Sequence, residues 1–168
     1  VHGALWIAIK TPQSLESKAM TVAKKFWFLE LIFAVIFMIL TDLFTNLYDN
    51  FISMPVWFIL LLIAVVSLIV TGVYIIKQKS ARAFVFSSLF ILTLVLNGVV
   101  GLYPNLIPSS IDPEYSLTIF NSSSSPYTLK VMTIVAVFFI PIVIAYQIWT
   151  YKTFMYKITE KDLKEEGY

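Results

Sequence analysis

Four long runs of apolar residues dominate this sequence. They extend from Phe26 to about Tyr48, from Pro55 to Ile76, from Ala83 to Leu102 and from Val131 to about Phe154. Each has about 20 or more residues, enough for a helix to cross the hydrocarbon core of a bilayer. Backbone groups in lipid must be satisfied within their own segment, and the alternation of membrane β-strands is absent. We therefore predict an all-α protein, a polytopic transmembrane helical bundle with four full spans.

Composition agrees with a membrane protein and excludes several classes of site. Only 13% of the 168 residues are charged and the mean hydropathy is +0.85, whereas soluble domains carry about 25% charged residues. The chain has no cysteine, which excludes disulfides, thiolate metal sites and haem attachment through paired cysteines. Its net charge of +2 is too small to indicate a nucleic-acid partner.

The first residues are apolar from Val1 to Ile9, without the basic head and cleavage site of a signal peptide. Nine residues are too few to cross a bilayer. We expect residues 1–10 to be the end of a truncated transmembrane helix, and the sequence to be a fragment or one half of a larger protein. Residues 11–25 are predicted as a cytoplasmic connection, with Thr11 as N-cap and Pro12 opening a short helical turn.

The long connection from Tyr103 to Met132 differs from the apolar runs on either side. It holds four of the seven prolines and the serine run Ser122–Ser125, which favours an ordered, turn-rich loop. We assign the loop to residues 103–130 within a bundle spanning 26–156, and expect Ser125 to cap the fourth helix. Pro141 should kink that helix. Residues 157–168 form a polar tail in which Thr159–Asp162 resembles a capping box, indicating a short helix.

Basic residues indicate the orientation. The connections on one side of the predicted bundle hold eleven of the twelve Lys and Arg residues, and the positive-inside rule makes that side cytoplasmic. The C-terminus is then inside and the loop 103–130 outside. The eleven residues are Lys10, Lys18, Lys24, Lys25, Lys77, Lys79, Arg82, Lys152, Lys157, Lys161 and Lys164; Lys130 is the exception.

Two residues are candidates for a buried polar or proton-path role. His2 is the only histidine and is expected within the bilayer, where it serves either as a haem or proton-relay residue or as a packed, hydrogen-bonded side chain. Asp42 lies about two turns from the outer end of the first span, and a carboxylate in the core needs a partner or a wet cavity. Glu30 is close enough to the interface to reach water. We identify no catalytic, cofactor-binding or metal-binding residue.

Small and polar residues mark one side of the second and third spans. Such faces indicate close helix packing in membranes. They comprise Ser67, Thr71, Gly72, Ser87, Ser88, Asn97, Gly98 and Gly101.

A series of short stretches resembles subunit II of the cytochrome bd-type quinol oxidases. Their order and spacing together carry the resemblance, which is clearest from about Ala81 to Leu163 and extends in weaker form to His2–Thr11. The stretches are Ala83–Ser88, Pro104, Pro108–Ser110, Ser116–Ile119, Asn121, Thr128–Leu129, Met132, Pro141–Val143, Tyr146, Trp149 and Ile158–Asp162.

The resemblance implies a role in a bacterial plasma-membrane complex that oxidises quinol and reduces oxygen to water in respiration. In this family, subunit II has two four-helix halves, and the chain looks like the second. The family's b- and d-type haems and its quinol-oxidation loop belong to subunit I. The resemblance therefore implies a non-catalytic, haem-free structural subunit bound to subunit I and the lipid bilayer. It also allows a small accessory subunit and a structural quinone.

Two functions of other classes remain open from the residues alone. A fragment of a small polytopic transporter or permease would need substrate-binding polar groups near the midplane, and the chain offers Asp42, Asn97 and His2. A freestanding membrane enzyme would need a cluster of catalytic groups, which the sequence does not provide.

Overall fold

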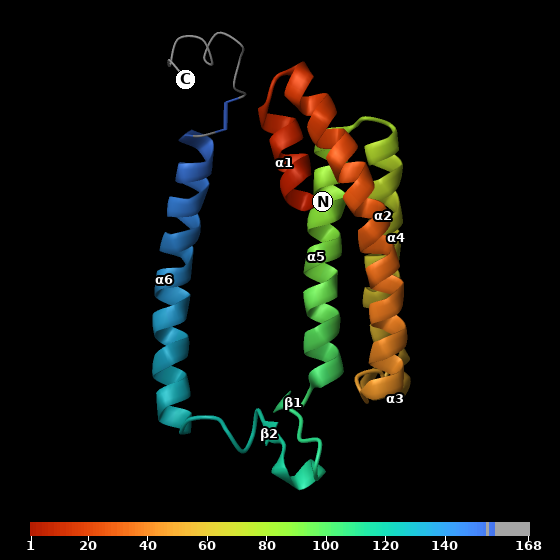
Figure 1. Cartoon of the computed structure of the whole chain (residues 1–168). Helices are drawn as coiled ribbons and strands as arrows, with labels where there is room; N and C mark the ends of the chain where they lie inside the picture. Colours follow the sequence, from red (N-terminus) through yellow and green to blue (C-terminus); the bar gives the residue numbers. More distant parts are fainter. Residues whose placement is uncertain (154, 157–168) are drawn as a thin grey trace. The chain divides into compact units, whose positions relative to one another are not determined.

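The computed structural model describes residues 1–153, 155 and 156, which fall into two compact units (Figure 1). The N-terminal unit is Val1–Tyr103 and the C-terminal unit is Pro104–Tyr156. The predicted capping box at Thr159–Asp162 and the rest of the tail lie outside the described residues.

Helices make up nearly all of the N-terminal unit. In chain order they are α1 (His2–Lys10), α2 (Gln13–Phe44), the short α3 (Asp49–Ser53), the 3-10 turn η1 (Pro55–Trp57), α4 (Phe58–Ile76) and α5 (Ser80–Leu102). The C-terminal unit has strands β1 (Asn105–Ile107) and β2 (Leu117–Thr118), the 3-10 turn η2 (Pro113–Tyr115) and helix α6 (Pro126–Thr153).

Four of these segments are long and apolar enough to cross a membrane: Ser14–Phe44, Pro55–Ile76, Ser80–Leu102 and Pro126–Thr153. The prediction of an all-α, polytopic bundle with four full spans is therefore confirmed. The ends differ from the predicted ones, because residues 13–25 of the segment that the sequence indicated as a connection are the first part of an unbroken α2. The first span ends at Phe44 rather than Tyr48, where α3 begins a separate short turn.

The predicted cap of α2 is wrong in detail. Pro12, not Thr11, occupies the N-cap position, and its carbonyl accepts bonds from the backbone N–H groups of Leu15 and Glu16. The Thr11 hydroxyl instead donates to the Ile7 carbonyl, at 2.8 Å. Thr11 therefore closes the end of α1 rather than opening α2.

Helices α4 and α5 make the most extensive contact in the chain, through small and polar side chains. The buried face of α5 consists of Ala83, Ser87, Phe90, Thr93, Asn97 and Gly101, and that of α4 of Ala64, Ser67, Leu68, Thr71, Gly72 and Ile75. Hydroxyls on these faces bond one turn back, as Thr71 does to the Ser67 carbonyl at 2.7 Å. Small residues let two backbones approach closely in lipid. The predicted packing role is confirmed for the buried members of the set, whereas Ser88 and Gly98 are only half-buried and a Cβ on Gly98 would meet nothing within 4 Å.

Trp27 joins α2 to α4. Its indole Nε1 donates to the Leu68 carbonyl at 2.9 Å, and its side chain is buried. A Cβ placed on Gly72 would overlap the same indole ring. A glycine at this position of α4 is therefore what allows the tryptophan to lie flat against the helix backbone.

The C-terminal end of α5 is held by Asn50, a residue of α3. Its side-chain Nδ2 donates to the carbonyls of Val100, Gly101 and Tyr103, among the carbonyls that a helix leaves unpaired at its C-terminus. Leu47 packs beside it, directly against Gly101. The short segment between α2 and α4 therefore caps a neighbouring helix.

The turn between α4 and α5 contains the one described non-glycine residue with positive φ. Gln78 has φ of 54°, and the Lys79 N–H that follows donates to the Tyr74 carbonyl at 2.9 Å. This is the hydrogen bond of a Schellman-type helix ending, whose left-handed position is usually glycine.

The loop before α6 is ordered, as predicted. Strands β1 and β2 pair antiparallel, with Asn105 opposite Thr118, and the Ser116 hydroxyl accepts from the Ser109 N–H at 3.0 Å. Ser125 caps α6: its hydroxyl accepts from the Thr128 N–H and its carbonyl from the Leu129 N–H. The loop thus ends at Ser125, earlier than residue 130.

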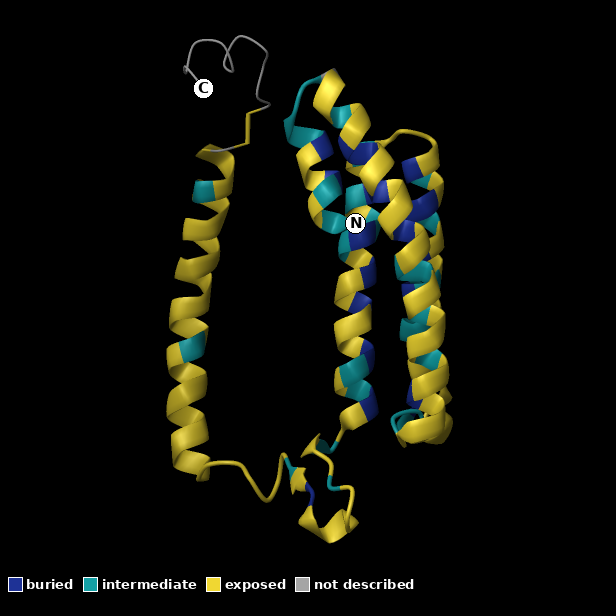
Figure 2. Ribbon diagram, viewed as in Figure 1, coloured by how far each residue is buried: buried dark blue, intermediate teal, exposed yellow. Residues whose placement is uncertain are grey.

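Burial differs sharply along the chain (Figure 2). Dark blue, buried residues follow the facing sides of the helices in the N-terminal unit, whereas α6 is exposed along nearly its whole length. No described residue of α6 is buried, and the helix continues through Pro141. The kink predicted at Pro141 stays a prediction.

Candidate functional site

Two places bring polar side chains together among apolar helices, and each contains one of the residues singled out in the sequence. The first is around His2 in α1 and the second around Asp42 near the end of α2. The structure places them in separate parts of the N-terminal unit, since His2 contacts α5 and Asp42 faces α3 and α4.

His2 is anchored on α5 by two neighbouring side chains. Its Nδ1 lies 3.1 Å from the Ser87 hydroxyl oxygen, and its ring stacks on Phe84 with centroids 4.3 Å apart. The Phe84 ring also meets Trp6, one turn along α1. These contacts fix the imidazole against α5, which is what a packing histidine requires and is also compatible with a proton-relay role.

The chain offers few of the usual haem ligands, because it has one histidine and no cysteine. The Nδ1 atom of the one histidine is engaged by Ser87. Within the described residues, no three His, Asp or Glu side chains are grouped to hold a metal ion. We derive no step through a haem in this chain.

Asp42 lies on the exposed side of α2, in a groove with a volume of about 380 Å³ between α2, α3 and α4. It forms no ion pair or hydrogen bond with any residue in the described part of the chain. The groove, called here the Asp42 groove, is lined by Met38, Ile39, Asp42, Tyr48, Ile52, Phe58 and Leu61.

Tyr48 supplies the second polar group of the Asp42 groove. Burial, and secondly the nearby Asp42 carboxylate, raise the pKa of the Tyr48 hydroxyl above its usual range. Tyr48 therefore keeps its proton at neutral pH and remains a hydrogen-bond donor beside a carboxylate. Tyr48 was not among the residues predicted from the sequence. Its position just beyond a span that carries a carboxylate near its end was the one sequence signal that could have identified it.

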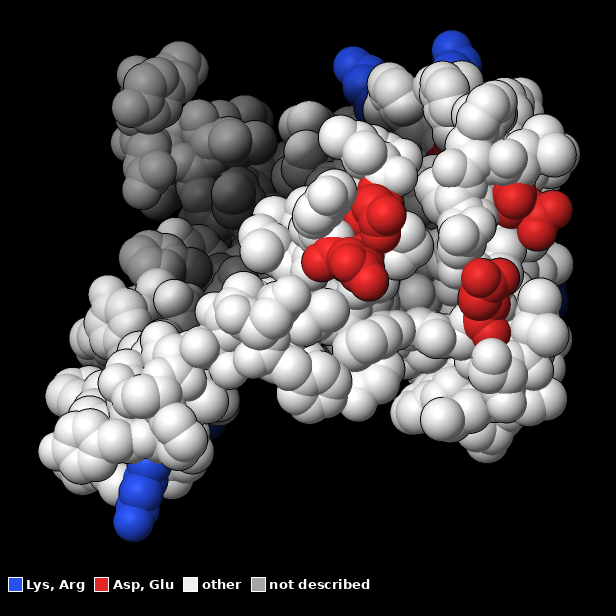
Figure 3. Space-filling view, turned by 90° about the horizontal axis from the view of Figure 1, so that it is seen from below, with Lys and Arg blue, Asp and Glu red and all other residues white. Residues whose placement is uncertain are grey.

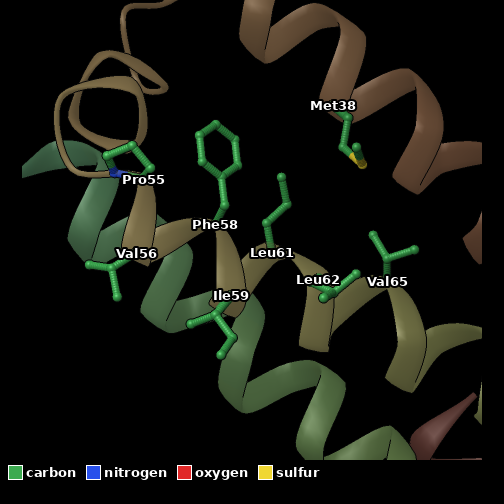
Figure 4. Close-up of a pocket in the computed structure, with 8 residues that line it drawn as sticks. All are labelled: Met38, Pro55, Val56, Phe58, Ile59, Leu61, Leu62 and Val65. Atoms are coloured by element: carbon green, nitrogen blue, oxygen red, sulfur yellow. The ribbon is translucent and has the colours of Figure 1, made fainter.

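A second, wholly apolar groove adjoins the first, because the two share Met38, Phe58 and Leu61. It has a volume of about 680 Å³ and is further lined by Pro55, Val56, Ile59, Leu62 and Val65. In Figure 4, Met38 of α2 points toward the side chains of Leu61 and Val65 on α4. We call this second hollow the apolar groove.

The other polar residues of the spans act within the bundle. Asn97 is buried on α5, where its Nδ2 donates to the Thr93 carbonyl at 2.8 Å, and its Oδ1 has no partner among the described residues. Glu30 is half-buried on α2. Neither residue lines the two grooves described above.

The fold and these sites define a multi-pass helical membrane protein. A family model described as "Cytochrome bd terminal oxidase subunit II" matches residues 1–154. The chain therefore belongs to the cytochrome bd oxidase subunit II family, and the resemblance noted in the sequence is confirmed.

Curated relatives agree with this family. The chain is 31% identical over 165 residues to "Cytochrome bd ubiquinol oxidase subunit 2" of Bacillus subtilis, an alignment covering 96% of this chain and 47% of the relative. It is 40% identical over 87 residues to "Cytochrome bd-I ubiquinol oxidase subunit 2" of Escherichia coli K12, covering 52% and 23%. "Probable cytochrome oxidase subunit 2" of Haemophilus influenzae is 31% identical, covering 89% and 47%. The chain thus spans about half the length, or less, of these relatives.

Proposed function

We propose that this chain is the second half of a haem-free structural subunit in a terminal oxidase that oxidises quinol and reduces oxygen to water. The observation that carries the proposal is the family match along residues 1–154. The chemistry is assigned to a partner, subunit I, which holds the b- and d-type haems. The single histidine and the absence of cysteine support this division, since this chain alone cannot supply two histidines or a cysteine to a haem.

The structural role rests on how the N-terminal unit is built. Its spans are locked by small-residue contacts and by Trp27, with hydroxyls bonded to backbone carbonyls of their own helices. Outward-facing surfaces of α2, α4 and α5 remain apolar and exposed within the chain. Such a rigid, apolar-sided bundle suits a subunit that supports a larger partner in a bilayer.

His2 and Asp42 are both candidates for a proton path, but their surroundings differ. His2 has a hydrogen-bond partner on α5 through Ser87. Asp42 opens onto a groove on the exposed side of α2. We propose no path connecting the two, and the role of each is to be decided by proton-release measurements on the intact complex.

The proposed orientation puts the basic end of the N-terminal unit in the bacterial cytoplasm. The α1–α2 and α4–α5 connections lie at one end of the N-terminal unit (Figure 1). That end carries Lys77 and Lys79 in the second connection, Lys10 at the end of α1 and Arg82 in the first turn of α5, whereas the other end carries Asp42 and Asp49. This asymmetry follows the positive-inside rule. The substitutions Lys79→Cys and Ser123→Cys, made in this stretch of 168 residues that has no cysteine of its own, should label from the cytoplasmic and the outer side, respectively. The reverse pattern would overturn the orientation.

The function is tested by purifying the intact protein from its native membrane in mild detergent and recording a reduced-minus-oxidised absorption spectrum. Co-purification of a larger subunit with b- and d-type haem bands is the expected result. A haem-free eluate without a partner would contradict the proposal and would favour a transporter, with Asp42 as the first residue to change in a transport assay.

A further inference from the structure

The Asp42 groove and the apolar groove together form one elongated hollow with a polar end and an apolar end. Asp42 and Tyr48 provide the polar end, and the remaining lining residues are apolar. The polar end lies near the end of α2, whose last helical residue is Phe44, while Tyr48 lies beyond it. The hollow therefore starts close to the membrane boundary.

From that boundary the apolar part leads toward the middle of the membrane. Met38 is one turn deeper than Asp42 along α2, which is about 6 Å. The lining of the apolar groove begins at Pro55 and Val56 in η1 and continues along α4 from Phe58 to Val65, about 10 Å along the axis of α4. A polar end at the interface and an apolar floor directed inward is the arrangement in which a membrane lipid lies.

The charge at the polar end indicates which lipid headgroup fits. Asp42 carries a carboxylate for which no ion-pair partner exists in the described part of the chain. A charge at membrane depth is costly unless it is paired or reaches water. Figure 3 views the molecule from below and shows Asp and Glu side chains, in red, at its surface. A headgroup with a primary ammonium complements this end, whereas an anionic headgroup would be repelled.

We propose that the hollow between α2 and α4 binds one aminophospholipid, with its ammonium against Asp42, its phosphate region beside the Tyr48 hydroxyl and one acyl chain along Leu61, Leu62 and Val65. The ammonium donates hydrogen bonds to the carboxylate, a charge-assisted contact. The acyl chain covers the apolar side chains that form the second groove. The proposal requires only that the helices span a membrane, so it stands or falls independently of the proposed function.

The test uses the intact protein, in its complex, reconstituted with equal amounts of phosphatidylethanolamine and phosphatidylglycerol of identical chains. Bound lipid that survives detergent washing is counted by native mass spectrometry. Asp42→Asn removes the charge at constant size, and Asp49→Asn is its matched control, because Asp49 is also exposed but lines neither groove. We expect Asp42→Asn to reduce the preference for phosphatidylethanolamine about fivefold relative to Asp49→Asn.

A second pair of variants tests the acyl chain. Leu62→Trp fills the apolar groove and should lower retention of either lipid, whereas Ile69→Trp, two turns along α4 and outside the groove, should not. Equal headgroup preference in the two aspartate variants would overturn the proposal. The proposal would also be overturned if a quinone were bound in place of the lipid. A crosslink from position 62 to another protein chain would overturn it as well, because it would show that protein rather than lipid covers the groove.

Discussion

The N-terminal unit and helix α6 are built from equally apolar sequences, but they bury them differently. A third of the most apolar window of α4, 33%, is buried within the chain, against 0% of the corresponding window of α6. Helix α4 has Ser67, Thr71 and Gly72 on one face, and all three are buried. Hydropathy alone therefore identifies a span, while small and polar residues at helical spacing identify the face that another helix of the same chain covers.

Three threonines of α6 bond to carbonyls of their own helix. The hydroxyls of Thr133, Thr150 and Thr153 each donate to the carbonyl four residues earlier, at 2.8–3.0 Å. In the N-terminal unit, by contrast, Trp27 and Asn50 bond to carbonyls of other helices. Substitutions in the N-terminal unit should therefore affect folding far more than matching substitutions in α6.

The largest difference is expected between two tryptophans. Trp27→Ala removes a buried ring and its bond to Leu68, which should lower the free energy of unfolding by about 3–5 kcal/mol. Trp149→Ala on α6, where the side chain is 67% exposed, should change it by less than about 1 kcal/mol. Unfolding of the intact protein in mixed detergent micelles measures both. Equal losses would show that α6 is packed as tightly as α2 in the intact protein.

Two glycines of α5 make a sharper comparison within one helix. A Cβ on Gly101 would overlap the Leu47 side chain and lie 2.9 Å from its carbonyl oxygen, whereas one on Gly98 meets nothing within 4 Å. Gly101→Ala should therefore destabilise the protein by about 1–3 kcal/mol. Gly98→Ala should be neutral or stabilise it by up to about 1 kcal/mol through helix propensity. The same detergent titration decides, and a stable Gly101→Ala would mean that Leu47 can move away.

A substitution of Asn50 tests whether the short segment between α2 and α4 holds the C-terminal end of α5. Asn50→Ala leaves the carbonyls of Val100, Gly101 and Tyr103 without this donor and should cost about 1–2 kcal/mol. Asn46→Ala, at an exposed position of the same segment, is the control. Faster amide hydrogen exchange in the last turn of α5, seen only in Asn50→Ala, is the expected signature. Unchanged exchange would show that water replaces the amide without loss.

Much of this architecture follows from the sequence, and the failures have physical causes. The four spans, the ordered loop, the Ser125 cap and the packing face of α4 and α5 are set by local patterns of hydropathy, proline and small residues. Strands β1 and β2 were not predicted. They have only five residues in total and are separated by the η2 turn, so they are too short to show an alternating pattern in the sequence. The continuous α2 was missed because lysines within a helix resemble those of a connection.

The candidate site was predicted in part. His2 and Asp42 were selected from the sequence as polar residues in an apolar context, but the sequence could not say which way they face. Beyond Lys25, helix α2 has apolar residues on every side and only Glu30, Thr41 and Asp42 as polar ones, so its period does not reveal the side that Asp42 occupies. The structure places Asp42 on the exposed side, opening onto a groove, and His2 against Ser87.

The smallest expected effect is that of replacing a glutamine by glycine, which should have opposite signs in the N-terminal unit and in α6. Gln78 has a positive φ at the end of α4, where a side chain is strained, so Gln78→Gly should stabilise the protein by about 0.5–1 kcal/mol. Gln147 lies inside α6, so Gln147→Gly should destabilise it by about the same amount, because glycine weakens a helix interior. A shift of the unfolding midpoint in opposite directions is the expected result. A destabilised Gln78→Gly variant would show that the side chain's own bond to the Ile75 carbonyl, at 3.4 Å, outweighs the backbone strain.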